Sequence, residues 1–395
     1  MAAIPFVAKA NVFLLACCQA LSMTAMNVIV VVTGLIGLSL ADDKALATVP
    51  LGLQFCGMMV STIPSAFVMK RFGRRFGFTF GSLVGVSGGL LATWAVLQGS
   101  FWGFAGASFV IGFANGISQL YRFAAAEAAP EAFRSRAISL VMAGGVVSAT
   151  FGPEFAIWSR DLLAPVAFAG CFLVVTTLHV VAIVLQQFLR IPPPTQIERR
   201  APGRPLREIA RQPAFMVAIL GAMIGYSVMS LVMTSTPLAM LACNHAFADT
   251  AFVIQWHALG MYAPSFVTGH LIHRFGILNV ILAGALLIVA CIAINLSGEA
   301  VTHFWIALCL LGIGWNFVFV GATTLLTRTH TPAERAKVQS FNDFLVFGSV
   351  TLASFSSGVL LHAFGWAAVN IGVTPLIAAT ILAVLWLKAR APSLR

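Results

Sequence analysis

Charged residues are scarce in this sequence. Only 9% of its 395 residues are Asp, Glu, Lys or Arg, whereas 59% are hydrophobic. Such a chain has too little polar surface to fold as an ordinary soluble protein. It is therefore predicted to be an integral membrane protein, with membrane lipids as its surroundings.

The patterns of several enzyme and metal-site classes are missing as well. All seven cysteines lie inside apolar runs, without CxxC or His/Cys ligand spacing, and there is no HExxH or P-loop sequence. These gaps disfavour a zinc site, a disulfide framework and a membrane enzyme. The net charge of +11 forms no stripe suited to nucleic acid. We expect no metal, no cofactor, no enzymatic activity and no nucleic-acid partner.

Apolar runs divide the chain into twelve predicted membrane-spanning helices, since a span needs about 20 apolar residues. The predicted spans are 12–38, 49–69, 76–97, 101–128, 137–158, 166–189, 213–236, 250–272, 278–297, 303–327, 338–361 and 365–388. The first run is too long for a signal-peptide core, and we interpret it as an uncleaved span. The polar stretch 191–212 is predicted to be a cytoplasmic linker between a bundle at 1–190 and one at 213–395.

Lysine and arginine are distributed unequally between the two sides of these spans. With the N-terminus inside, 20 of the 23 Lys and Arg residues fall in inner segments, whereas Lys44 and Arg160 fall outside and Arg122 lies within a span. Inner loops retain basic residues. The pattern predicts a multi-pass protein of the cell inner membrane with both termini in the cytoplasm.

Two short motifs recur about 200 residues apart. Ala66–Gly73, after the second span, aligns with Gly269–Gly276 after the eighth. Pro130–Arg136, after the fourth span, aligns with Pro332–Lys337 after the tenth. The matches indicate a duplicated six-helix unit. Such repeats are typical of alternating-access carriers, whose substrate sites lie near the bilayer midplane.

The loop Lys70-Arg71-Phe72-Gly73-Arg74-Arg75 resembles the G-x-x-x-D-R-x-G-R-R signature of the major facilitator superfamily, and His273-Arg274-Phe275-Gly276 resembles a weaker copy. The resemblance covers essentially the whole chain. It implies an all-α membrane protein of twelve transmembrane helices in two pseudo-symmetric six-helix bundles, acting as a secondary transporter. Two positions depart from the signature, because Ala66 replaces its glycine and Lys70 its aspartate.

The same resemblance implies a cytoplasmic gate built from charged residues. In the family, the loop acid joins a network with loop arginines and with an acid at the end of the fourth span, which Glu127 matches here. Glu127 could pair with Arg74 or Arg71, although Lys70 adds repulsion. Asp343 belongs either to this gate, in contact with Arg274, or to the cavity. The predicted gating residues are Lys70, Arg71, Gly73, Arg74, Glu127, Arg274 and Asp343.

Ionisable and amide groups at membrane depth are costly, so they are candidates for substrate binding or coupling. Arg122 either lines the cavity or pairs with Glu127 or Glu154, and Glu154 could equally reach water at the outer boundary. His257 could couple protons, or could be a buried, hydrogen-bonded side chain. The predicted binding or coupling residues are Asn27, Gln54, Gln119, Arg122, Glu154, Tyr226, Gln255, Trp256, His257, Tyr262, Trp315 and Asn316.

Aromatic rings, amides and one deep cation fit a small neutral or anionic solute, for instance a flat heteroaromatic compound. The chain weakly resembles bacterial riboflavin-uptake members of the superfamily, which makes riboflavin one candidate. Gly144, Gly145, Gly152 and Pro153 resemble part of the Gly-Pro motif of antiporters, whose end is replaced here. We therefore predict a monomeric uptake carrier, with proton coupling left open. A drug or metabolite efflux antiporter is the alternative, and a channel or sensor is the third hypothesis.

Overall fold

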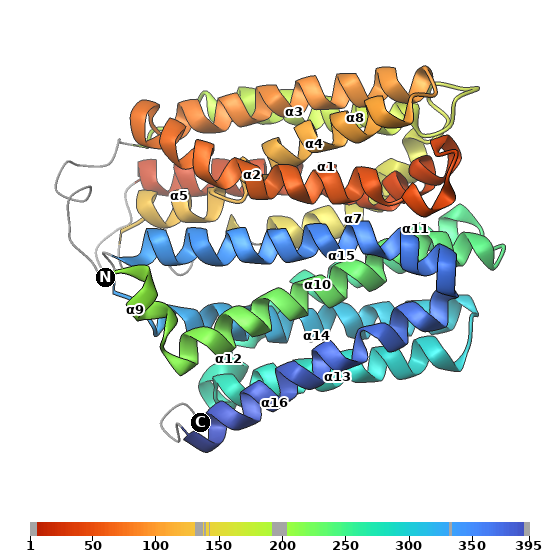
Figure 1. Cartoon of the computed structure of the whole chain (residues 1–395). Coiled ribbons are helices and arrows are strands. Elements are labelled where there is room, and N and C mark those ends of the chain that lie inside the picture. The colour runs from red at the N-terminus through yellow and green to blue at the C-terminus, as the bar shows by residue number, and fades with distance from the viewer. Residues whose placement is uncertain are drawn as a thin grey trace. The chain divides into compact units, whose positions relative to one another are not determined.

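The computed structural model describes residues 6–130, 137, 140, 141, 143–191, 204–331 and 334–390, without the side chains at 66, 67, 70, 123, 126, 127, 335 and 336. The elements in these ranges are helices, and no strand occurs among them (Figure 1). The helices form two compact units, of which the first contains α1 to α8 and the second contains η1 and α9 to α16.

The first unit holds seven helices within the described residues. They are α1 (Phe6–Leu40), α2 (Val49–Phe72), α3 (Arg74–Leu97), α4 (Phe101–Ser118), α5 (Tyr121–Ala128), α7 (Gly144–Ser159) and α8 (Ala169–Gln186). Helix α3 packs against α4 and α8, and α1 packs against α7 and α8. The unit is therefore a helical bundle with α1 and α3 in contact with several neighbours.

The second unit is a bundle of similar size. Its elements are η1 (Lys44–Leu46), α9 (Leu206–Ala210), α10 (Pro213–Ala242), α11 (Phe247–Tyr262), α12 (Ser265–Phe275), α13 (Ile277–Ser297), α14 (Val301–Thr327), α15 (Arg335–Gly372) and α16 (Thr374–Arg390). Helix α10 packs against both α14 and α15, and α14 also packs against α11 and α13 (Figure 1).

Two predicted spans are interrupted rather than continuous. The span predicted at 101–128 is split between α4 and α5, where the Leu120 amide bonds to the Ile117 carbonyl in a tight turn. The span predicted at 250–272 is split between α11 and α12 at Ala263 and Pro264, and proline has no N–H to continue a helical ladder. The hydrophobic pattern continues across both breaks, so composition alone did not reveal them.

The chain near Gly365 agrees with the prediction. Element α15 comprises two helices that meet at Gly365. Gly365 has φ +80, in the left-handed region that glycine adopts readily, and it interrupts the helix there. The boundary predicted between the spans 338–361 and 365–388 therefore lies at this break.

Nine helical segments of the described residues are long and apolar enough to cross a membrane. One of them, Lys337–Arg390, has 54 residues, which is enough for two crossings. Arg160 and Asp161 form an exposed ion pair at 3.6 Å beyond the end of α7. These nine segments contain the long apolar runs of the sequence.

Glycines let α2 and α4 pack backbone to backbone. A Cβ atom on Gly112 would lie 1.9 Å from the Gln54 carbonyl oxygen, and one on Gly116 would lie 2.8 Å from the Met58 carbonyl oxygen. Small residues at such contacts are a common device of membrane helices. The two helices could not approach this closely with larger side chains at these positions.

We expect Gly112→Val to destabilise the first unit by about 3 kcal/mol, because the added atoms overlap backbone that cannot move aside cheaply. Thermal unfolding of the purified protein in detergent measures the effect. Gly106→Val is the matched control, because Gly106 lies on the same helix with nothing within 4 Å of an added Cβ. Equal unfolding temperatures for the two variants would contradict the close packing.

Candidate functional site

Five side chains from four helices of the second unit meet in what we call the aromatic cluster: Tyr226 (α10), Tyr262 (α11), Trp315 and Phe319 (α14), and Phe347 (α15). The Trp315 and Phe319 rings lie parallel, with centroids 5.0 Å apart and an interplanar angle of 10°. The Tyr226 ring meets them edge-on, at 5.2 Å and 5.5 Å. Ring faces and edges in this arrangement can hold a further planar ring.

Trp315 carries an unused hydrogen-bond donor. Its side chain is only 6% exposed, and its Nε1 has no partner among the described residues. A buried donor left unpaired costs about 1–3 kcal/mol. The neighbouring Gly314 packs against the Gly284 carbonyl oxygen of α13, at 2.8 Å from an added Cβ, which holds α14 in place. A ligand with an acceptor atom would satisfy the indole.

The predicted candidates on α11 lie in different surroundings. His257 is fully buried, and its Nδ1 lies 2.8 Å from the Leu308 carbonyl oxygen of α14. A carbonyl only accepts, so Nδ1 is the donor. Trp256 is 38% exposed and contacts Trp305 at 5.7 Å between ring centroids. Gln255 is half-buried. The ring contacts of Trp256 therefore run to the start of α14, away from Trp315.

Asn316 joins three chain segments at the interruption between α11 and α12. Its Nδ2 donates to the Met261 carbonyl at 2.7 Å and to the Ser265 hydroxyl at 2.6 Å. Its Oδ1 accepts from the Thr268 hydroxyl at 2.7 Å. These bonds use both the amino group and the carbonyl of the amide. Asn316 thus satisfies backbone and side-chain groups that the break near Pro264 would leave unpaired.

A buried polar network lies in the first unit. Gln186 Nε2 of α8 lies 2.7 Å from the Tyr121 hydroxyl and 2.8 Å from the Ser82 hydroxyl, and donates to both. His179 lies nearby and bonds through Nδ1 to the Val175 carbonyl oxygen at 2.8 Å. A pocket of about 10 Å³ between these side chains is large enough for one water molecule. The polar groups of this network are thus held between α3, α5 and α8.

Besides Gln186, whose Oε1 is unpaired, three buried amides of the first unit have atoms without a hydrogen-bond partner among the described residues. They are Gln19 on α1, Gln54 on α2 and Asn115 on α4. Gln54 was predicted from the sequence, whereas Gln19 and Asn115 were missed. Each is an amide inside an apolar run, so the same signal could have identified all three.

Ser22 donates to Ser118 at 2.6 Å between α1 and α4.

The other predicted residues of the first unit are more exposed. Gln119 and Arg122 are both half-buried and lie on either side of the turn between α4 and α5. Asn27 on α1 donates to the Ser148 hydroxyl of α7 at 3.1 Å. Glu154 is exposed on α7. The break at Leu120 thus places Arg122 in the first turn of a new helix, next to the buried Tyr121.

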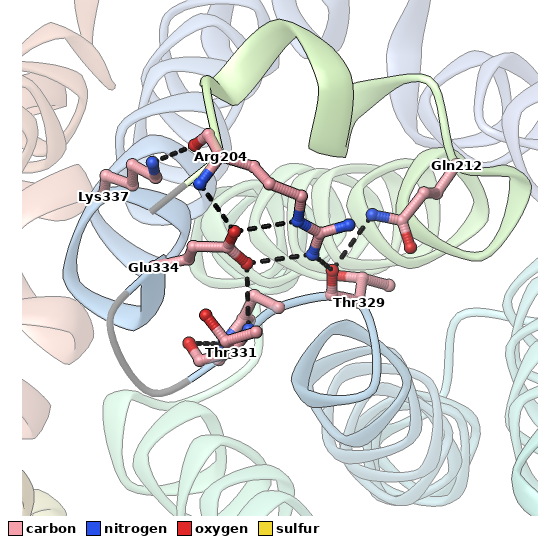
Figure 2. Close-up of polar contacts among 7 residues, drawn as sticks. Arg204, Gln212, Thr329, Thr331, Glu334 and Lys337 are labelled. Carbon is pink, nitrogen blue, oxygen red and sulfur yellow. Dashed lines mark hydrogen bonds and ion pairs between the residues drawn. The ribbon is translucent and has the colours of Figure 1, made fainter. Parts of the chain in front are cut away.

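A group of charged and polar contacts closes one end of the second unit (Figure 2). The Glu334 carboxylate accepts from Arg204 Nε and the Arg204 amide at 2.8 Å, from Arg204 Nη2 at 2.9 Å and from the Thr331 amide at 2.9 Å. The Glu334 residue is 1% exposed. We call the contacts among Arg204, Gln212, Thr329, Thr331, Glu334 and Lys337 the clasp.

The clasp also holds the end of α14. The Thr329 carbonyl accepts from Arg204 Nη2 at 3.2 Å and from Gln212 Nε2 at 3.0 Å, and Lys337 Nζ donates to the Arg204 carbonyl (Figure 2). The sequence did not predict this pairing, because Arg204 and Glu334 are 130 residues apart. Arg204 was counted only among the basic residues of the linker.

The Arg204 guanidinium, assisted by the Thr331 amide, holds the pKa of Glu334 well below the usual glutamate range, and Glu334 raises the pKa of Arg204. A carboxyl group whose pKa is lower in the folded than in the unfolded protein stabilises the fold at pH values above its unfolded-state pKa. This stabilisation is lost only as the pH falls through the folded-state pKa. We therefore expect the difference in unfolding temperature between wild type and Glu334→Gln to stay constant from about pH 5.5 to 8. A difference that shrinks within that range would contradict the assignment.

Comparisons with known proteins agree with the geometry. The family model of the Major Facilitator Superfamily matches residues 13–350. The chain belongs to this superfamily. It is 42% identical over 379 residues to the riboflavin transporter RfnT of Brucella anthropi, with 95% of each chain covered. It is 26% identical to the uncharacterized MFS-type transporter YdeG of Bacillus subtilis, over 91% of this chain and 88% of that one.

Solved structures of the superfamily share the fold. The human organic anion transporter MFSD10 (TETRAN) matches with a TM-score of 0.72 at 12% identity, over 96% of this chain and 100% of that one. A D-xylose-proton symporter matches with a TM-score of 0.71 at 14% identity, over 95% and 96%. The predicted twelve-helix membrane fold and transport function are confirmed. The protein is a multi-pass membrane transporter of a small-molecule substrate.

The superfamily's loop signature has the same local geometry in both copies. Arg71 lies over the ring of Phe72, at 5.4 Å from its centroid, and Arg274 lies over Phe275 at 5.3 Å. The glycine that follows has φ +84 at Gly73 and φ +85 at Gly276, and each separates two helices. The repeat seen in the sequence thus corresponds to a repeated structural element: a helix end with a cation over a ring, then a left-handed glycine.

The remaining gating candidates are placed only in part. Arg74 Nη1 lies 3.0 Å from the Met69 sulfur, and Asp343 is half-buried and accepts from Asn342 at 3.1 Å. The side chains of Lys70 and Glu127 lie outside the described part of the chain. The pairing of Glu127 with Arg74 or Arg71, and that of Asp343 with Arg274, stay predictions.

Proposed function

We propose that this protein carries riboflavin across the bacterial inner membrane into the cell. The observation that carries the proposal is the aromatic cluster with the unpaired Trp315 Nε1. The isoalloxazine ring of riboflavin is flat, neutral and aromatic, and its edge bears carbonyl and nitrogen acceptors. It can stack on the rings and accept from the indole. The 42% identity to a riboflavin transporter supports the same substrate.

Within this proposal, Tyr226, Tyr262 and Trp315 contact the substrate. In the first unit, Gln54, Gln119 and Arg122 remain candidates for substrate binding or coupling. We assign Asn316 and His257 to joining helices, because their hydrogen bonds run between α11, α12 and α14. Asn27, Glu154, Gln255 and Trp256 remain candidates of the same class. The proposed gate comprises the signature loops, Glu127 and Asp343.

The topology and energy source belong to the proposal too. The excess of Lys and Arg on one side of the spans supports cytoplasmic termini and an inner-membrane location. One solved structural neighbour is a proton symporter, which makes proton coupling a reasonable hypothesis to test by a pH gradient. We propose that the protein works as a monomer surrounded by lipid.

The Gly-Pro segment favours packing over an antiporter role. An added Cβ on Gly144 would lie 2.8 Å from the Ala20 nitrogen, and one on Gly152 would lie 2.5 Å from the Asn27 Cβ. The glycines therefore allow α7 to lie close to α1. This contact accounts for the two glycines by packing, and the incomplete Gly-Pro motif favours uptake over the antiporter alternative.

Purified protein reconstituted into liposomes tests the proposal. Vesicles loaded with buffer should accumulate riboflavin, and a pH gradient should change the rate only if protons are coupled. Liposomes without protein and an excess of unlabelled riboflavin are the controls. Failure to take up or bind riboflavin, with another solute transported instead, would refute the substrate. Export driven by an inward proton gradient would favour the antiporter.

A further inference from the structure

The clasp joins the ends of three helices that also carry the aromatic cluster. Gln212 immediately precedes α10, Thr329 follows the end of α14, and Glu334 immediately precedes α15. The clasp bonds between these residues and Arg204 hold the three helix ends together (Figure 2). Any sliding of one helix along the others would break at least one of these bonds.

Clasp and cluster lie at matching distances along the three helices. Tyr226 comes 14 residues after Gln212, Trp315 comes 14 residues before Thr329, and Phe347 comes 13 residues after Glu334. At 1.5 Å per residue, each separation is about 20 Å. The clasp thus lies at one end of the three helices. The aromatic rings meet about 20 Å, or about four helical turns, further along them.

Direct contacts lie near the clasp, beside the cluster and beyond it. Phe215 of α10 stacks on Phe341 of α15, with centroids 6.5 Å apart and an angle of 18°. Further along α10, an added Cβ on Gly225 would lie 2.7 Å from Val318 of α14. Beyond the cluster, the Ser230 and Ser354 hydroxyls are 3.0 Å apart. Close packing of this kind transmits an axial shift rather than absorbing it.

The clasp differs from an ordinary surface ion pair. Exposed pairs contribute little, because water and salt screen them. Here the Glu334 side chain is 2% exposed and Arg204 holds it with two side-chain nitrogens. Its oxygens also accept two backbone N–H groups. The Arg204 side chain is 39% exposed, so the buried partner is Glu334, and a shift of the helices would leave its carboxylate oxygens unsatisfied.

We propose that the clasp sets the axial register of α10, α14 and α15, so that Arg204 and Glu334 act as positioning residues for substrate binding at the aromatic cluster. They contact no substrate, and they act through the three helices. The inference rests on the proposed function for the identity of the ligand, riboflavin. The mechanical link between clasp and cluster is independent of that ligand.

Binding of riboflavin to purified Arg204→Ala and Glu334→Gln protein tests the proposal. We expect the Kd and the KM for uptake to rise roughly fivefold to tenfold, with the turnover per molecule within about twofold of wild type. Arg204→Lys should be intermediate, because lysine keeps the charge and loses the bidentate fork. Arg207→Ala is the matched control, since it removes an exposed arginine of the same linker segment and should bind as wild type.

Hydrogen–deuterium exchange of the peptides that contain Tyr226 and Trp315 is the second measurement. Exchange there should be faster in Arg204→Ala and Glu334→Gln than in Arg207→Ala. A lower unfolding temperature with wild-type Kd and wild-type exchange at these peptides would overturn the proposal. The clasp would then only stabilise the fold. If wild-type protein does not bind riboflavin, the proposed function fails, and the exchange result alone then decides the role of the clasp.

Discussion

Riboflavin uptake by Trp315→Ala should fall by about a hundredfold. The substitution removes a ring that stacks on Phe319 at 5.0 Å and the unpaired indole donor, which together contribute about 3 kcal/mol to a bound planar ligand. Trp315→Phe keeps an aromatic ring and loses the N–H donor, so its rate of riboflavin uptake should fall about tenfold. Initial rates of uptake into proteoliposomes, divided by the amount of reconstituted protein, measure both effects.

Trp305→Ala is the matched control for this prediction. Trp305 lies on the same helix, α14, and meets Trp256 edge to face in a separate group, at 5.7 Å between ring centroids. Its loss should leave uptake within about twofold of wild type, after allowance for unfolding temperature. If Trp305→Ala and Trp315→Ala lose uptake equally, the effect belongs to the packing of α14 and the aromatic cluster is not the binding element.

Arg122→Ala should abolish uptake, to below about one-fiftieth of the wild-type rate, with the protein still folded and inserted. The expectation follows from the predicted role of Arg122 in binding or coupling, since a guanidinium at membrane depth is costly to place. Bonds from a charged donor contribute about 1.5–3 kcal/mol each. Arg122→Lys retains the charge without the planar fork and should recover part of the activity. The measurement is uptake per reconstituted molecule, with folding checked by size-exclusion chromatography and the amount inserted by protein content of the floated proteoliposomes.

Arg160→Ala provides the comparison, because Arg160 belongs to the same unit and is 44% exposed beside Asp161. Its loss should leave transport nearly unchanged, since exposed ion pairs contribute little. Normal uptake by Arg122→Ala would refute a role in binding or coupling. Loss of transport together with loss of the folded protein would instead assign Arg122 to structure, and Arg122→Lys distinguishes these outcomes by restoring fold without full activity.

Much of the fold could be predicted because lipid imposes simple demands on a sequence. Every backbone polar group must be satisfied inside the membrane, so long apolar runs become helices. The repeated Arg-Phe-Gly motifs, recognised in the sequence as copies, have the same local structure, since in both the glycine follows a helix end and has a positive φ. The two interruptions, near Leu120 and Pro264, were missed because apolar residues continue on both sides of each break.

The candidate site was less predictable, because a polar residue in an apolar run has several possible partners. Tyr226, Tyr262 and Trp315 were named from the sequence and do meet in one cluster. Trp256 was named on the same grounds and lies in another. Periodicity assigns a residue to a face of its own helix, and it does not say which neighbouring helix covers that face.

By itself, the sequence determined that this is a helical membrane transporter built from a repeated unit, because hydropathy, charge distribution and repeats are local or additive properties of the chain. The tertiary structure decided which aromatic rings stack, which amides join helices and which arginine meets Glu334. Those outcomes depend on contacts between residues far apart in the chain, such as Arg204 and Glu334. Only the packing of helices brings such groups within hydrogen-bonding distance.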